Sequence, residues 1–466
     1  MATFSRYTIA GQSYKIYIAF ILGMISILIM QNGIRIMMVN TDNIYTEPPT
    51  SSIRMEEERD YKVVQLITTS LQPSKSSKPS QVTTTPIAHP QLGNVLTLDS
   101  PQPRVEPSRY PTDFTKLPYL DQIEKDLKPF SNNITLDLIH YVQKFDYTVR
   151  VQYINQTLYS YPIENQRRNE IGKDQDSHSR TNDFVKLIKN AVNLYQTPDF
   201  DMVINLHDGP RACGQYVGSP IFSFQKTDAC SDLLLPCALH PVLGTKHYDD
   251  DIQRISTIGK NYSWSQKINK IIWRGSGTGG IWDNTNLHTM VRFRIFVECD
   301  KLELKDVCDI GLLNLNQVKD GVTINDPRII FRERIPFDDW MKYKYELVLD
   351  GNGSPAGRIE RQLAHNSLLL MQESDNYQMY TRYLKPFVHY VPLQNNVSNL
   401  VAAYQWARDN EEKVLNIIQS ANDFAQLLKH ESILYYTHIL LSNYSSRLSF
   451  RPQLEPGYNI TVWSIL

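Results

Sequence analysis

With 466 residues, the chain is longer than one hydrophobic core usually organises, so two folded domains and an unstructured remainder are expected. Its 48 basic and 49 acidic residues give a net charge of -1, which excludes a general attraction to polyanions and, with it, nucleic acid as an expected partner. Five cysteines without a C-x-x-C pair argue against a zinc knuckle and a thioredoxin-type motif.

The most apolar stretch of the chain, residues 16–34, reads IYIAFILGMISILIMQNGI and carries no charge. As a helix with a rise of about 1.5 Å per residue, it just spans a hydrocarbon core of about 30 Å. We therefore expect a transmembrane anchor here and a cytosolic tail over 1–15, as in a type II membrane protein. The alternative is a cleaved signal peptide, but its apolar region is shorter, ~7 to 15 residues, and no A-x-A-like cleavage site follows.

Residues 35–110 are rich in Ser, Thr, Pro and Gln and hold too few large apolar residues to offset the entropy of ordering. We expect a disordered stem. Beyond it we divide the chain into an N-terminal acceptor-side domain over 111–245, a C-terminal donor-binding domain over 246–430, and a C-terminal helix and tail over 431–466.

Short apolar runs in the folded region, at 202–206, 270–273 and 345–349, end in the polar loops HDGP, RGSGTGG and DGNGSPAGR. Amphipathic helices lie between and after such runs, most clearly over 414–428. Strands alternating with helices predict an α/β fold with a parallel sheet, whose ligands bind beyond the carboxyl ends of the strands. The three polar loops sit at such ends.

Two features favour a luminal location for the folded region. N-x-S/T acceptor sequons begin at Asn133, Asn155, Asn261, Asn352, Asn396, Asn443 and Asn459. Disulfides are permitted, with Cys230–Cys237 and Cys299–Cys308 as the nearest pairings, and the odd cysteine count leaves one thiol over. The alternative, that most cysteines are small buried apolar residues, stays open.

The strongest local motif is the glycine-rich loop of DGNGSPAGR, with Gly351, Gly353, Ser354 and Gly357 ahead of Arg358. Glycines let the backbone approach a ligand, helix-start N–H groups face anions, and an arginine adds bidentate positive charge. A departing diphosphate requires this combination. The alternative is a structural turn whose arginine pairs with its own helix.

A second small-residue loop, WRGSGTGG, carries Arg274 and Ser276, with Arg292 and Arg294 downstream. Two such loops in one chain favour phosphate binding. Each arginine taken singly is more often structural, and neither loop is a Walker A or GxGxxG fingerprint.

Asp208, in the loop HDGP, follows an apolar run and can accept the proton of an attacking hydroxyl group. His207 is the competing base. The alternative for an Asp before Gly-Pro is a turn residue.

In this order, the segments DMVINLHDGP, PIFSFQKTDACSDLLLP, KIIWRGSGTGG, KYKYELVLDGNGSPAGRIERQLAHNSLLL and YLKPFVHYVPL resemble glycosyltransferase family 90, the Rumi-like protein O-glucosyltransferases and fungal capsule xylosyltransferases. The resemblance covers most of residues 195–400. It implies a GT-B fold of two Rossmann-like domains facing a cleft, metal-independent inverting transfer from a UDP-sugar, and residence in the secretory pathway.

The resemblance assigns the general base to Asp208 and the charge stabilisation of departing UDP to Arg358. Spacing leaves open whether Arg292 or Arg294 is the downstream donor-site arginine. The candidate donor-binding residues are Arg274, Ser276, Arg292, Arg294, Gly353, Ser354, Ala356, Gly357 and Arg358.

The expected function is therefore transfer of glucose or xylose from a UDP-sugar to a hydroxyl group of a protein or glycan, without a cofactor or metal, in the lumen of the Golgi or endoplasmic reticulum. The chain ends in WSIL, not in a KDEL-like sequence, which favours the Golgi. One alternative is a metal-dependent GT-A transferase that uses the D-x-D pair Asp249 and Asp251, with Asp338–Asp339 as a weaker candidate; such aspartates are more often a solvated loop or helix start. The other alternative is a membrane-anchored ligand-binding glycoprotein without turnover.

Overall fold

The computed structural model describes the strands within residues 3–39 and the ranges 113–131, 134–163, 173–237, 248–301, 303–355, 357–458 and 460–463. The chain forms two compact units, residues 1–94 and 95–466. The predicted stem, apart from residues 35–39, lies outside the described residues, as do Ala356, Asn133 and Asn459.

The first unit contains an antiparallel four-stranded sheet in sequential order. Its strands are β1 (Thr3–Ile9), β2 (Gln12–Ile21), β3 (Met24–Gln31) and β4 (Ile34–Val39). The helix expected over 16–34 is therefore replaced by β2, β3 and the start of β4. The run is rich in isoleucine, a β-branched residue that favours strands. In the described part of the chain, no helix is both long and apolar enough to cross a membrane.

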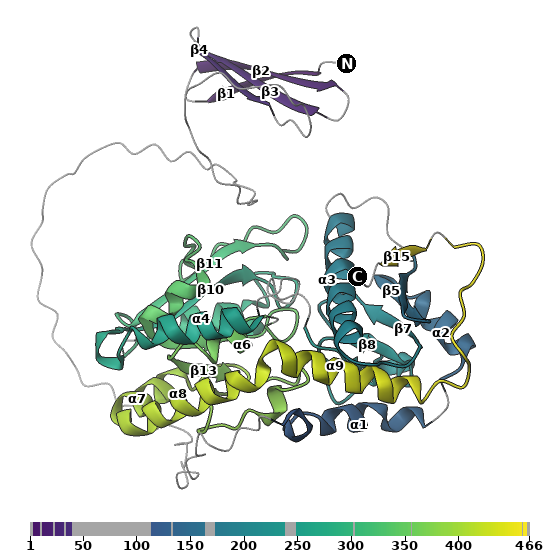
Figure 1. Cartoon of the computed structure of the whole chain (residues 1–466). Coiled ribbons are helices and arrows are strands. Elements are labelled where there is room, and N and C mark those ends of the chain that lie inside the picture. The colour runs from purple at the N-terminus through teal and green to yellow at the C-terminus, as the bar shows by residue number, and fades with distance from the viewer. Residues whose placement is uncertain are drawn as a thin grey trace, which may run out of the picture. The chain divides into compact units, whose positions relative to one another are not determined.

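The second unit contains two sheets (Figure 1), and one of them is fully parallel. Its strands are β10 (Ile268–Gly277), β11 (Cys308–Leu315), β12 (Tyr343–Val348), β13 (Leu368–Gln372) and β14 (Val391–Leu393). The spatial order β11-β10-β12-β13-β14 is that of a doubly wound sheet, and the strand order reverses between β10 and β12. Such a sheet binds ligands in the crevice beyond the strand ends at this reversal point, where the two predicted loops follow.

Helices cover this sheet. They are α4 (Tyr248–Lys260), α5 (Val291–Cys299), α6 (Ile359–Gln362), α7 (Leu400–Asp409) and α8 (Glu411–Ala425). Helix α5 packs on β11, α7 on β14, and α8 on β13. The amphipathic helix expected over 414–428 is confirmed, since α8 and the following turn bury Val414, Ile417, Phe424 and Leu428.

The other sheet is mixed, with the order β15-β6-β5-β7-β8-β9. Its strands are β5 (Thr148–Ile154), β6 (Thr157–Ser160), β7 (Phe200–Asn205), β8 (Ile221–Ser223), β9 (Leu233–Leu234) and β15 (Thr461–Trp463). Strands β7, β8 and β9 are parallel, whereas β5 runs antiparallel to both β6 and β7. Asn155 and Gln156, both with positive φ, form the tight turn that reverses the chain between β5 and β6.

The mixed sheet packs with helices α1 (Asp121–Leu127), α2 (Leu136–Gln143), α3 (Lys173–Leu194) and α9 (His430–Ser445). Helix α9 packs on α3 and β7, so the segment after residue 430 returns to the first half of the folded region (Figure 1). The C-terminal tail is also held to this sheet by buried Arg150, which donates to Asp201 at 2.6 Å and to Glu455 of the tail at 2.8 Å. The α/β class is confirmed, and the GT-B arrangement with its domain boundaries stays a prediction.

The disulfides differ in part from the sequence expectation. Cys299–Cys308 is confirmed, but Cys230 pairs with Cys213 instead of Cys237. The residues between Cys230 and Cys237 include strand β9, and an extended chain of this length separates its ends by about 20 Å, far beyond the ~4.4 to 6.8 Å that a disulfide bridges. Cys237 takes part in neither disulfide, and its side chain is buried.

Candidate functional site

The first element of the site is the turn that follows β7. The side chain of Asn205 shapes this turn, because its Oδ1 accepts the His207 N–H at 2.9 Å and its Nδ2 donates to the Gly209 carbonyl at 2.8 Å. These bonds satisfy backbone groups that a sharp turn would otherwise leave unpaired. The turn presents Asp208 just past the carboxyl end of β7, with 42% of its side chain exposed.

The carboxylate of Asp208 is held at both oxygens. Arg180 of α3 donates from Nη1 to Oδ1 at 2.9 Å, and Asn352 donates from Nδ2 to Oδ2 at 3.1 Å. His207, the competing base, is partly buried. Burial lowers the pKa of its imidazole, and the charges of Arg211 and Arg180 lower it further, which disfavours the protonated form.

A glutamine joins this turn to the glycine-rich loop after β12. Gln225 donates from Nε2 to the Asp208 carbonyl, and its Oε1 accepts the Ser354 N–H at 2.5 Å. A Cβ on Gly353 would lie 1.9 Å from Gln225 Nε2, so the close approach requires glycine at this position. Segments far apart in sequence, at the ends of strands in different sheets, are thereby brought into contact.

The loop after β10 meets the same group of residues. The Gly279 N–H donates to Asn352 Oδ1 at 3.2 Å. Arg292, from α5, donates from Nη1 to the Ser276 carbonyl at 2.6 Å and from Nε to the Asp350 carbonyl at 2.8 Å. Arg292 therefore bridges the loops that follow β10 and β12.

Arg292 and Arg358 form the positive part of the site. Both are partly buried, and Arg358 donates from Nη1 to the Arg274 carbonyl at 3.1 Å. Burial, followed by the charge of Arg358, lowers the pKa of Arg292 to about 10, and burial followed by the charge of Arg334 lowers that of Arg358. Among the residues that the structure describes, neither guanidinium forms a salt bridge with a carboxylate. Both donate hydrogen bonds to carbonyl groups and lie against aromatic rings, and two desolvated cations in such surroundings favour an anionic ligand.

The other two candidate arginines have different partners. Arg274 pairs with Asp309 of β11 at 2.6 Å and also donates to backbone carbonyls, so its side chain links β10 to β11. Arg294 donates to the Asn396 carbonyl at 2.6 Å, ahead of α7. Positions 292 and 294 lie about 200° apart around a helix, which explains why only Arg292 reaches the loops.

The remaining candidate residues of the glycine-rich loop lie around the start of α6. Ser354 is buried, and its Oγ accepts from Gln378 Nε2 at 3.1 Å. Gly357 has a φ of +66°, a conformation that glycine adopts without strain. Beside Asn352 the loops after β10 and β11 line a cavity of about 500 Å³.

Of the two acidic clusters considered as metal ligands, the structure describes the side chains of only one. Asp249 and Asp251 fall in the first turn of α4, and their side chains lie outside the described residues. Asp338 forms ion pairs with Arg254 and Arg361 at 2.6 and 2.5 Å.

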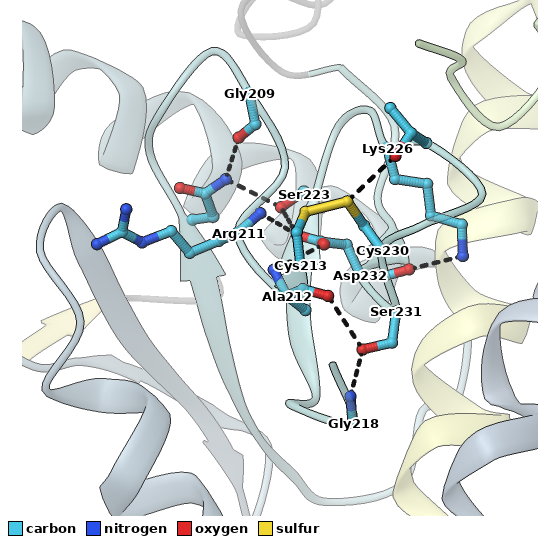
Figure 2. The surroundings of a disulfide bond; sticks show 12 residues. Gly209, Arg211, Ala212, Cys213, Gly218, Ser223, Lys226, Cys230, Ser231 and Asp232 are labelled. Atoms are coloured by element: carbon cyan, nitrogen blue, oxygen red, sulfur yellow. Dashed lines mark hydrogen bonds between the residues drawn. A yellow bond between two sulfur atoms is a disulfide. The ribbon is translucent and has the colours of Figure 1, made fainter. Parts of the chain in front are cut away.

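One further group resembles a metal site by proximity alone. Cys213, Cys230 and Asp232 lie together, but the two sulfurs form a disulfide and offer no thiolate (Figure 2). The carboxylate of Asp232 instead accepts the N–H groups of Arg211 and Ala212, both at 2.8 Å. The disulfide and Asp232 thus anchor the chain that leaves the Asp208 turn.

Comparison with known proteins identifies the family of the chain. The sequence profile of Glycosyl transferase family 90 matches residues 116–464. The chain belongs to this family. The resemblance expected from five short segments is thereby confirmed and extends over nearly all of the second unit.

Individual relatives are identical to this chain at about a quarter of the aligned positions. Protein O-glucosyltransferase 2 of Danio rerio is 26% identical over 279 residues, 56% of this chain and 50% of that protein. Protein O-glucosyltransferase 3 of Homo sapiens is 25% identical over 307 residues, 63% and 55% of the two chains. Protein O-glucosyltransferase 1 of Bos taurus is 25% identical over 360 residues, 75% and 85%. The aligned region spans about half the length of the first two relatives.

Of the predicted residues, Asp208, Ser276, Arg292, Gly353, Ser354 and Arg358 come together in the loops at the strand ends. The sequence interpretation missed Arg180, Gln225 and Asn352. Gln225 and Asn352 stand inside segments that carry the family resemblance, which is the one signal that marked them. Arg180 lies in a helix without a motif.

Proposed function

We propose that this member of glycosyl transferase family 90 is an inverting glycosyltransferase that moves a sugar from a UDP-sugar to an acceptor hydroxyl group. The observation that carries the proposal is the hydrogen-bonded contact between the Asp208 turn and the glycine loops, with Arg292 and Arg358 beside them. A base and an anion site at adjoining strand ends are the two parts that direct displacement requires.

In the proposed reaction, Asp208 takes the proton of the acceptor hydroxyl as its oxygen bonds to the anomeric carbon. The bond between that carbon and the diphosphate oxygen breaks, and UDP leaves with the electron pair. Arg358 and Arg292 stabilise the charge that develops on the diphosphate, and interactions that strengthen as the bond breaks lower the barrier. A single displacement inverts the anomeric centre and needs no enzyme nucleophile.

The names of the relatives favour a protein acceptor and glucose as the sugar, with xylose as the second candidate from the family resemblance. A secretory compartment is favoured by the two disulfides, which persist in oxidising environments. Exposed sequon asparagines at 155, 261, 396 and 443 agree with such a compartment.

The test is a panel of UDP-sugars incubated with the full chain, with and without acceptor protein, and read as released UDP. We expect release from UDP-glucose or UDP-xylose that persists in EDTA. Loss of activity in EDTA with restoration by manganese would favour the metal-dependent GT-A alternative instead. UDP binding without release from any donor would favour the ligand-binding glycoprotein.

A further inference from the structure

The side chain of Asn352 connects three segments that the proposed reaction uses. It belongs to the loop after β12, its Nδ2 donates to Asp208 Oδ2 at 3.1 Å, and its Oδ1 accepts the Gly279 N–H at 3.2 Å. Asp208 is 144 positions away in sequence and Gly279 is 73 positions away. Both ends of one amide are thus engaged by residues that only the fold brings together.

The glycines on either side of Asn352 pack closely against side chains of other segments. A Cβ on Gly351 would lie 2.5 Å from Arg292 Nη2, and one on Gly353 would collide with Gln225. The turn closes through a backbone bond from Gly351 N–H to the Gly353 carbonyl at 2.9 Å, which does not use the asparagine side chain. The amide is therefore free of the local turn-forming role that asparagine often has in loops.

A carboxylate base works only if a lone pair faces the hydroxyl proton, and an exposed aspartate can rotate about its terminal bond. Arg180 fixes Oδ1 of Asp208, and Asn352 fixes Oδ2. Each carboxylate oxygen can accept two hydrogen bonds, so Oδ2 keeps one lone pair for the proton of the attacking hydroxyl group. With both oxygens bonded, the plane of the carboxylate is set.

We propose that Asn352 is a positioning residue that orients the Asp208 carboxylate and links that orientation to the donor-binding loops, an inference that rests on the proposed function. Asn352 also lines the cavity of about 500 Å³ beside the loops.

Two substitutions test this role. For Asn352→Ala we expect kcat to fall roughly 10- to 100-fold, as for other misplaced reacting groups, with KM for the donor within about twofold of wild type. Asn352→Asp keeps the shape but sets a second carboxylate against Asp208, and like charges raise the apparent pKa of such a pair. The acidic limb of its pH–rate profile should therefore move up by about one pH unit.

Because Asn352 begins a sequon, the matched control is Asn261→Ala, which removes another exposed sequon asparagine, in the turn between α4 and β10 and outside these loops. It should match wild type in kcat and pH profile. An active wild type whose Asn352→Ala variant keeps its kcat, or loses only melting temperature, would overturn this inference and leave the proposed function standing. An inactive wild type would overturn both.

Discussion

At the scale of single residues, the partners of Arg358 bear most directly on its proposed role. The sequence left open that it pairs with an acidic neighbour on its own helix, but it donates a hydrogen bond to the Arg274 carbonyl, and no carboxylate among the described residues lies within salt-bridge distance. Its neighbour Arg361 does have such a partner, Asp338 at 2.5 Å. Arg358, which caps the start of α6, and Arg361, within α6, thus have different partners.

We predict that Arg358→Ala lowers kcat by about 10²-fold or more while the protein stays folded, because its charge acts on the leaving diphosphate. Arg358→Lys should recover only part of this loss, since lysine keeps the charge without the two-pronged guanidinium. Arg361→Ala is the matched control and should lower the melting temperature with turnover per folded molecule unchanged. A stable, fully active Arg358→Ala variant would remove Arg358 from the donor site.

The sequence marked candidate site residues where polar loops follow apolar runs, as with Asp208 and Arg358, and their catalytic roles stay a prediction. Their hydrogen-bond partners were not predictable, because amide contacts depend on segments brought together by the fold. Gln225 contacts Ser354 across 129 positions, and Asn352 contacts Asp208 across 144. The sequence could not distinguish Arg292 from Arg294, because only the structure shows which side of α5 faces the loops.

At the scale of elements, the parallel sheet was predictable because β10 and β12 contain short apolar runs that are followed by glycine-rich loops. The mixed sheet was not, since the turn at Asn155 and Gln156 contains no glycine or proline. Residues 16–34 were misread as a helix because length and hydropathy alone do not separate a helix from successive strands. Sequence spacing also gave the wrong partner for Cys230. It pairs with Cys213, 17 positions away, and not with the nearer Cys237.

Helix α6, which follows the donor loop, contains a buried carboxyl group with a pH-dependent contribution to stability. Burial raises the pKa of Glu360 from 4.5 to about 7. Between these values the folded protein holds a proton that the unfolded chain releases, so the free energy of unfolding falls as pH rises through this window. The loss is on the order of 3 kcal/mol once pH exceeds the folded pKa.

Glu360→Gln should remove this dependence because the amide does not titrate. Urea unfolding of both proteins from about pH 5 to about pH 8 should show the variant gaining stability relative to wild type as pH rises. Parallel stability profiles would mean that Glu360 does not titrate in this range.

At the scale of the whole molecule, secretory residence predicts a pattern of glycosylation. Asn155, Asn261, Asn396, Asn443 and Asn352 are all exposed, but only for Asn352 are both ends of the side-chain amide hydrogen-bonded to the candidate site. Glycopeptide mass spectrometry of enzyme purified from a secretory host should find glycans at one or more of the first four and none at Asn352 in the active fraction. A fully active fraction glycosylated at Asn352 would contradict the site geometry.

The central claim is that the Asp208 turn supplies the base and the glycine loops supply the UDP-sugar site. The most direct measurement compares wild type and Asp208→Asn for UDP-sugar turnover and for UDP affinity on the same preparations. General-base catalysis contributes about 10²- to 10⁴-fold, so the variant should lose turnover by that amount and bind UDP nearly as well as wild type. Full turnover by Asp208→Asn would contradict the account.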